Sequence, residues 1–158
     1  MAQDFRTLIT ELWAKLKLGA PRFGDTETIA LSIDGLEVIL SESADGRHLL
    51  VSGLAGRPAR DQHAAEEEVR RLLRTSLGLV QGNRAGLRLD TSGEMPAFRV
   101  EGAYPYAANR LDDLTKLIED VLFRLELHAG ELAVSRPGRQ TGRPAFTQLS
   151  QDNIILNP

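Results

Sequence analysis

The chain has 158 residues, of which 42% are hydrophobic, so it is long and apolar enough to bury one core and is not a disordered protein. It contains no cysteine, which excludes disulfides, thiolate metal sites and a cysteine nucleophile. The net charge is −3, with +1 on residues 131–158 and −4 on the first 130 residues, and this mildly acidic body argues against nucleic acid, whose phosphates require a basic face.

The N-terminus, Met-Ala-Gln-Asp-Phe, has neither a basic segment nor a continuous apolar run, so no signal peptide is expected. No later stretch approaches the ~20 apolar residues that a membrane-spanning helix needs. We therefore expect a cytoplasmic protein that does not associate with a membrane.

The first expected element is a helix from roughly Asp4 to Leu18, with Asp4 as its N-cap and Gly19 as its stop. Trp13 lies beside the apolar stripe of this helix, so we expect it to be half-exposed. It either closes the edge of the core or anchors a partner protein. The stripe itself follows the i, i+3, i+4, i+7 spacing of one helical face and comprises Phe5, Leu8, Ile9, Leu12 and Leu16.

Three strands are expected next. Residues 29–33 and 36–40 are β-prone runs separated only by Asp34-Gly35, a pair that favours a two-residue turn with positive φ. A second Asp-Gly turn at residues 45–46 leads to a strand over residues 48–52. The three strands are predicted to form an antiparallel meander with one face packed on helices.

The second helix follows a loop over residues 53–60, and Asp61 is its expected N-cap. The acidic run at residues 66–68 lies toward the positive end of the helix dipole, and two of its glutamates are four residues before an arginine. We therefore interpret this run as helix electrostatics and not as a binding patch. The helix ends at Gly78 or Gly82, and its apolar stripe comprises Val69, Leu72, Leu73 and Leu77.

A second hairpin is expected over residues 87–90 and 97–100. Pro96 and Pro105 flank or follow it, and proline lacks the N–H that a strand ladder needs. These prolines therefore indicate a sheet edge or a strand end.

The third helix has the clearest signals. It is expected to begin after Asn109 as N-cap and to stop at Gly130, and about 20 residues give a length of roughly 30 Å. Leu117, Phe123 and Leu127 widen its apolar surface beyond one stripe, so we expect part of it to contact something other than the sheet. The main stripe comprises Leu111, Leu114, Ile118, Val121, Leu122 and Leu125.

The pattern ends near Ala133, where prolines and glycines replace the helical period. We predict one domain over residues 1–130 and a flexible C-terminal tail over residues 131–158. The sequence leaves open whether the apolar residues Ile154, Ile155 and Leu156 dock on the body or form a partner motif.

No catalytic or metal-binding pattern is present. His63 and Glu67 are four residues apart, but zinc requires three or four ligands, and the pair is interpreted as a surface contact. The sequence has neither a phosphate-binding glycine loop ending in Lys-Ser or Lys-Thr nor a GxSxG elbow. We therefore expect no catalytic residue, metal or cofactor, and a protein that acts by binding other proteins.

Several short patterns resemble one known family. They are FRTLITEL at residues 5–12, IDGL at 33–36, the Leu72-Leu73 pair and GLRLD at 86–90 before Gly93. Together with the order of the elements and the small acidic body, they resemble the class I type III secretion chaperones, the Tir-chaperone-like family, over residues 4–130. The fold expected is α+β, an antiparallel sheet with three helices in the order α-β-β-β-α-β-β-α.

The resemblance implies a homodimer with the second helix and the strand at residues 87–90 near its two-fold axis. It also implies that the N-terminal segment of a secreted effector winds around the dimer in extended form, and that the secretion apparatus is a further partner. The alternative is a non-secretory dimeric adaptor or regulator of the same fold.

Two sets of apolar residues are the candidate sites. The first set is expected to include both core positions and the walls of effector-binding pockets: Phe5, Leu8, Leu12, Trp13, Leu31, Ile33, Val38 and Leu40. The second set is the expected dimer interface: Val69, Leu72, Leu73, Leu77, Leu87 and Leu89.

Overall fold

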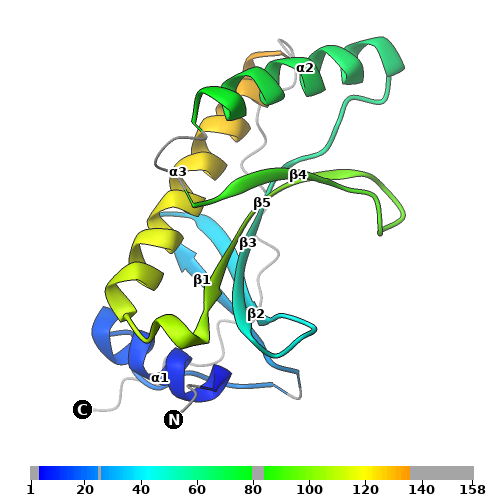
Figure 1. Cartoon of the computed structure of the whole chain (residues 1–158). Helices are drawn as coiled ribbons and strands as arrows, with labels where there is room; N and C mark the ends of the chain where they lie inside the picture. Colours follow the sequence, from blue (N-terminus) through cyan, green and yellow to red (C-terminus); the bar gives the residue numbers. More distant parts are fainter. Residues whose placement is uncertain (1–3, 25, 80–83, 136–158) are drawn as a thin grey trace, which may run out of the picture.

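The computed structural model of the chain describes residues 4–24, 26–79 and 84–135. The elements follow one another as α1 (Phe5–Leu16), β1 (Thr28–Ile33), β2 (Leu36–Glu42), β3 (His48–Gly56), α2 (Gln62–Gly78), β4 (Gly86–Asp90), β5 (Ala97–Pro105), the 3-10 turn η1 (Tyr106–Ala108) and α3 (Leu111–Val134) (Figure 1). This order confirms the predicted α-β-β-β-α-β-β-α arrangement of an α+β fold.

The strands form one antiparallel sheet in the order β1-β2-β3-β5-β4. The predicted meander is confirmed, and so is its first turn, because Asp34 and Gly35 have φ values of 52° and 81°. β1 and β4 are the two edge strands. Pro105 ends β5, as a strand-end proline should.

The two central strands are longer than predicted. β3 continues to Gly56, so the predicted loop over residues 53–60 begins too early. Glycines permit this extension because α3 packs directly on the strands. A Cβ atom added at Gly53 would lie 2.3 Å from Leu125 Cδ1, and one added at Gly102 would lie 2.5 Å from Leu117 Cδ1.

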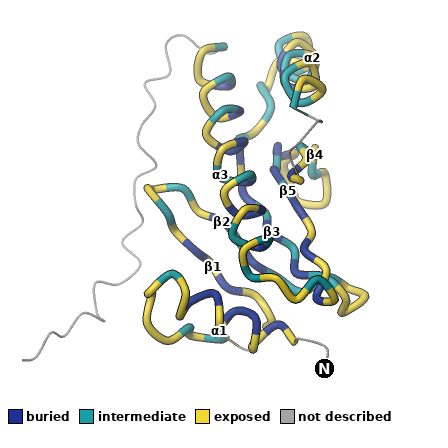
Figure 2. The backbone as a smooth tube through the Cα atoms, turned by 60° about the vertical axis from the view of Figure 1, so that its left-hand side comes forward, coloured by how far each residue is buried: buried dark blue, intermediate teal, exposed yellow. Residues whose placement is uncertain are grey.

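α1 and α3 form one layer against the sheet. α3 crosses β2, β3 and β5, and α1 lies against α3 near the start of that helix (Figure 1). Burial is concentrated where α1, α3 and the sheet meet (Figure 2). α2 contacts only α3 and β4 closely, and just two of its residues, Glu68 and Leu72, are buried.

Two helix starts agree with the sequence prediction. Asp4 accepts a hydrogen bond from the Thr7 N–H at 2.7 Å, and Asp61 accepts one from the Ala64 N–H at 2.9 Å. Both residues are therefore N-caps, as expected. α1 ends at Leu16, slightly earlier than predicted, because Lys17 adopts the left-handed conformation.

Both predicted ends of the third helix are wrong. Asn109 has a φ of 45° and ends η1, so Arg110 takes the cap position, its N–H bonded to the Tyr104 hydroxyl. The helix also passes Gly130, because an interior glycine costs only about 1 kcal/mol and Leu132 beyond it packs on Gly56 of β3. Residues 131–134 therefore complete α3 with Ser135 as its C-cap, and residues 136–158 of the predicted tail lie outside the described residues.

Candidate functional site

The residues predicted to bind an effector are mostly core residues. Ile33, at the end of β1, is the exception, because it is half-buried and lines a surface groove. Trp13 is only 7% exposed, so the expectation of a half-exposed tryptophan is wrong. Trp13 belongs to the main hydrophobic core, so the buried surface of α1 extends beyond its central stripe. The seven buried residues are Phe5, Leu8, Leu12, Trp13, Leu31, Val38 and Leu40.

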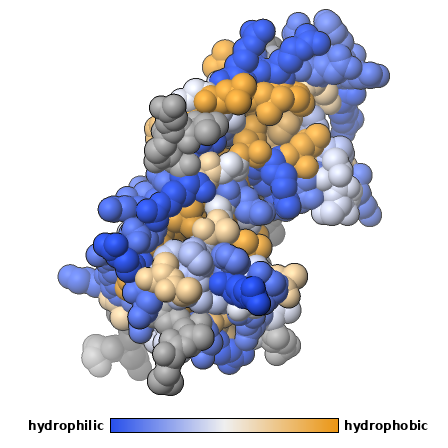
Figure 3. Space-filling model, in the orientation of Figure 1, coloured by the Kyte–Doolittle hydropathy of each residue, from blue (hydrophilic) through white to orange (hydrophobic). Residues whose placement is uncertain are grey.

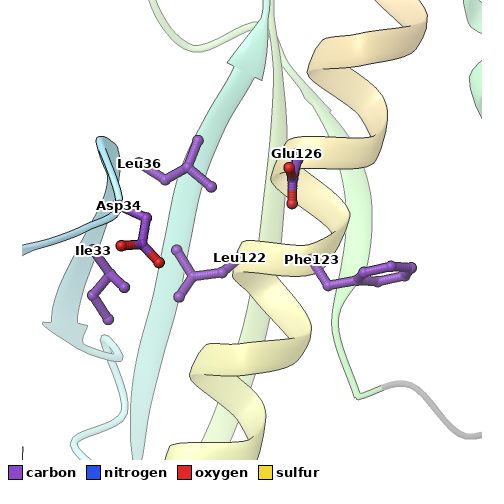
Figure 4. Close-up of a pocket in the computed structure, with 6 residues that line it drawn as sticks. All are labelled: Ile33, Asp34, Leu36, Leu122, Phe123 and Glu126. Atoms are coloured by element: carbon purple, nitrogen blue, oxygen red, sulfur yellow. The ribbon is translucent and has the colours of Figure 1, made fainter.

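A surface groove separates the β1–β2 turn from the middle of α3 (Figure 4). Its volume is about 310 Å³, and we call it the α3 groove. In Figure 4, Leu36 and Leu122 extend into the space between the turn and the helix, whereas Phe123 points away from the turn. The residues that line the groove are Ile33, Asp34, Leu36, Leu122, Phe123 and Glu126.

Part of the apolar surface of α3 is exposed, and its contact with something other than the sheet stays a prediction. Phe123 is 53% exposed and Leu127 is half-buried, whereas Leu117 is buried against the sheet. Sequence reasoning identified the excess apolar surface of the helix but missed the opposite wall, formed by Asp34 and Leu36. The only signal for that wall was the tight turn, which returns the chain beside α3.

The β1 edge lies beside this groove. β1 pairs with β2 on one side, and among the described residues no strand pairs with its other side. An edge strand presents unpaired backbone N–H and C=O groups to an incoming chain. An extended peptide can therefore pair with β1 while its side chains reach the α3 groove.

A second apolar surface covers α2 and β4, and we call it the α2–β4 surface. Hydrophobic side chains gather below α2 and over β4 in Figure 3. Three predicted interface residues are exposed there, namely Leu73 at 51%, Leu77 at 72% and Leu89 at 46%. Val69 and Leu87 are half-buried, and Leu72 is completely buried beneath them. An exposed apolar patch of this kind usually marks a protein-binding site.

Polar contacts fix α2 against α3. Ser76 Oγ lies 3.4 Å from His128 Nε2, His128 Nδ1 lies 3.0 Å from Glu131 Oε2, and the Thr75 hydroxyl donates to the same carboxylate. The serine, histidine and glutamate have the connectivity of a catalytic triad, but His128 is fully buried and lines no part of the α3 groove. We therefore describe these residues as a clamp between two helices.

A buried arginine extends the clamp. Arg124 of α3 donates from Nη2 to the Leu79 carbonyl oxygen at 3.0 Å, just beyond the end of α2. Burial lowers the pKa of its guanidinium group. The contacts with α3 are made by the C-terminal half of α2. This half of α2 is therefore held in place, and with it the leucines that α2 contributes to the α2–β4 surface.

Two further properties concern ligands and membranes. Among residues 4–24, 26–79 and 84–135, no group of three or more His, Asp or Glu side chains is placed to hold a metal ion. No helix in the same residues has the length and apolar character needed to span a bilayer.

Solved structures with the same fold include secretion complexes. A chain of the HopA1–SchA chaperone–effector complex has a TM-score of 0.62 and 22% identity, covering 80% of this chain and 93% of that chain. A chain of the ExoU–SpcU complex from the type III secretion system of Pseudomonas aeruginosa has a TM-score of 0.61 and 15% identity. The match covers 78% of this chain and 96% of that chain. A chain of the Yersinia pestis complex between the type III secretion chaperone SycH and a fragment of YscM2 has a TM-score of 0.58 and 14% identity. The match covers 78% of this chain and 98% of that chain.

Comparison at the sequence level identifies the family. No curated protein matches the sequence significantly. Residues 7–96, more than half of the 158 residues, match the Tir chaperone protein (CesT) family. They include α1 from its third residue on, the whole meander, α2 and β4. The chain therefore belongs to the Tir chaperone (CesT) family.

Proposed function

We propose that this protein is a type III secretion chaperone that binds the N-terminal segment of a secreted effector in extended form and keeps it competent for secretion. The observation that carries the proposal is the free edge of β1 beside the α3 groove, in a chain of the Tir chaperone family. Two of the proteins with the same fold were solved as a chaperone–effector complex and as a heterodimer from a type III secretion system.

The binding mode follows from the chemistry of an edge strand. An extended segment gains backbone hydrogen bonds along β1, and alternate side chains enter the α3 groove. Occupied in this way, the segment cannot fold on itself, and it remains thin enough for a narrow channel. Binding alone requires no ATP, and no cofactor takes part in this mechanism.

We further propose a homodimer formed through the α2–β4 surface. Exposed leucines on α2 and β4 would be covered by the same residues of a second copy, as a two-fold interface requires. The dimer would carry two effector-binding edges and would hold the effector in the cytoplasm until the secretion apparatus receives it.

Co-purification tests the function. The tagged chain is co-expressed with the N-terminal segment of a candidate secreted effector, and with the folded C-terminal domain of the same effector as the matched control. We expect retention of the N-terminal segment alone, in a form that proteases cleave readily once the chaperone is removed. Retention of a folded partner without any secreted segment would instead identify the dimeric adaptor.

A further inference from the structure

We propose that the α3 groove selects a lysine or arginine of the bound segment, with its cation between the carboxylates of Asp34 and Glu126 and its aliphatic stem on the groove floor. This inference rests on the proposed function, because it assigns a side-chain preference to the same binding surface. The occupant is an extended segment of the effector in which a basic residue is flanked by apolar residues.

The two carboxylates stand on opposite walls of the groove. Asp34 belongs to the β1–β2 turn and Glu126 to α3, and both side chains are exposed. Figure 4 shows the Asp34 carboxylate beside Leu122, on the side of the turn that faces the helix. In the part of the chain that the structure describes, neither carboxylate forms a hydrogen bond or an ion pair.

Four of the five other acidic side chains on α3 already have a partner. The hydrogen bond from Lys15 lowers the pKa of Asp112, for example. The paired acids are Asp112 with Lys15, Asp113 with Arg84, Asp120 with the Arg84 backbone N–H, and Glu131 with His128. Glu126 differs from these four acids, because its carboxylate forms no ion pair or hydrogen bond within the described residues. It lines the α3 groove and also a second surface hollow that contains Arg71.

The floor of the groove is apolar. Ile33, Leu36 and Leu122 are each half-buried, so they offer aliphatic contact without being sealed from the surface. Lysine and arginine fit such a site because their methylene stems lie on apolar surface while their charged heads remain at the rim. An acidic residue would meet two like charges at the same place.

Two isosteric substitutions isolate the charges. Asparagine tolerates the left-handed conformation of residue 34, so Asp34→Asn preserves the turn. Glutamine has nearly the helix propensity of glutamate, so Glu126→Gln preserves α3. Both variants should therefore fold like the wild type, which circular dichroism checks.

The experiment titrates the full chain with three peptides and follows the methyl resonances of Ile33, Leu36 and Leu122. The probes are acetyl-Leu-Lys-Leu-Lys-Leu-amide and the matched peptides with glutamine or glutamate in place of lysine. We expect the lysine peptide to bind at least about fivefold more tightly than the glutamate peptide, as two exposed ion pairs allow. The preference should fall in high salt, and the double variant D34N/E126Q should abolish it.

The control variant E94Q/E119Q removes the same charge from exposed positions that do not line the groove. Equal binding of the lysine and glutamate peptides, or an equal loss of preference in the control, would overturn the inference. If D34N/E126Q keeps the lysine preference, the inference also fails. The proposed function is still supported in that case, provided that the wild type co-purifies with an effector segment. A chain that retains no secreted segment refutes the proposed function itself.

Discussion

Leu72 and Leu73 are neighbours in sequence but lie in opposite environments. Leu72 is completely buried between α2 and the rest of the core, whereas Leu73 is 51% exposed on the α2–β4 surface. From the apolar stripe of the second helix, both leucines were predicted to lie at the dimer interface. A helical pattern defines which side of a helix is apolar, but it does not tell which residues of that side another element of the same chain covers.

Aspartate at these two positions should therefore have different effects. We expect Leu72→Asp to unfold the protein, since a buried unpaired charge costs several kcal/mol. Leu73→Asp should keep the fold and dissociate the dimer. Circular dichroism reports the thermal midpoint, and light scattering reports whether the mass exceeds the 17.4 kDa of one chain. A monomeric wild type at micromolar concentration would contradict the dimer proposal.

Asp90 provides a pH-dependent contact at the β4–β5 hairpin. Hydrogen bonds from the hydroxyl and N–H of Ser92 lower its pKa to about 2, and Arg99 Nε lies 2.9 Å from the other carboxylate oxygen. Because the folded-state pKa is below the unfolded value of about 3.9, the carboxylate stabilises the fold above pH 4 and loses this effect as pH falls to 2.

Replacement of Asp90 by asparagine should therefore lower the thermal midpoint at pH 7. The difference from the wild type should narrow below about pH 4 and vanish near pH 2. Glu94→Gln, in the loop of the same hairpin, is the matched control and should leave the midpoint unchanged at both pH values. A difference for Asp90→Asn that is constant across this range would refute the electrostatic explanation.

At the scale of elements, α2 is held to α3 mainly by polar contacts. Glu131 is central, because it bonds both Thr75 of α2 and His128 of α3. We expect Glu131→Ala to lower the unfolding free energy by about 1–3 kcal/mol, the cost of leaving buried polar groups without partners. Backbone amides of α2 should exchange faster, while those of β3 change less.

Glu119→Ala is the control for this substitution, because Glu119 is exposed on the same helix and outside the clamp. Equal acceleration of exchange in α2 and β3 would show that Glu131 stabilises the whole domain and not the helix contact. Hydrogen–deuterium exchange with mass spectrometry resolves the two cases.

The order of the elements was predictable from sequence because local signals agree with the fold. The Asp34-Gly35 turn and the Asp4 and Asp61 caps are examples. The ends of β3, β5 and α3 were not predictable, because long-range packing decides them. Gly53 and Gly56 look like loop residues until Leu125 and Leu132 of α3 are placed against them.

The candidate site was predictable only in part, for a related reason. Apolar periodicity identified the elements that form the core. Of the eight residues that it predicted to bind an effector, only Ile33 lines the α3 groove. A residue such as Leu36 belongs to the site because the turn brings it opposite Leu122, a residue far from it in sequence.

At the scale of the whole molecule, the free β1 edge and the α2–β4 surface lie at opposite edges of the sheet. This separation allows a dimer to form through one edge while the other remains available to an extended segment. Each copy would then offer its own β1 edge, so a long segment could contact both halves of the dimer.

Hydrogen–deuterium exchange of the chaperone with and without the effector's N-terminal segment tests the central claim most directly. We predict that binding protects the backbone amides of β1 and of residues 34–36, and that the bound segment itself gains protection without helical circular dichroism. Protection confined to α2 and β4, with β1 exchanging as fast as in the free protein, would contradict the account.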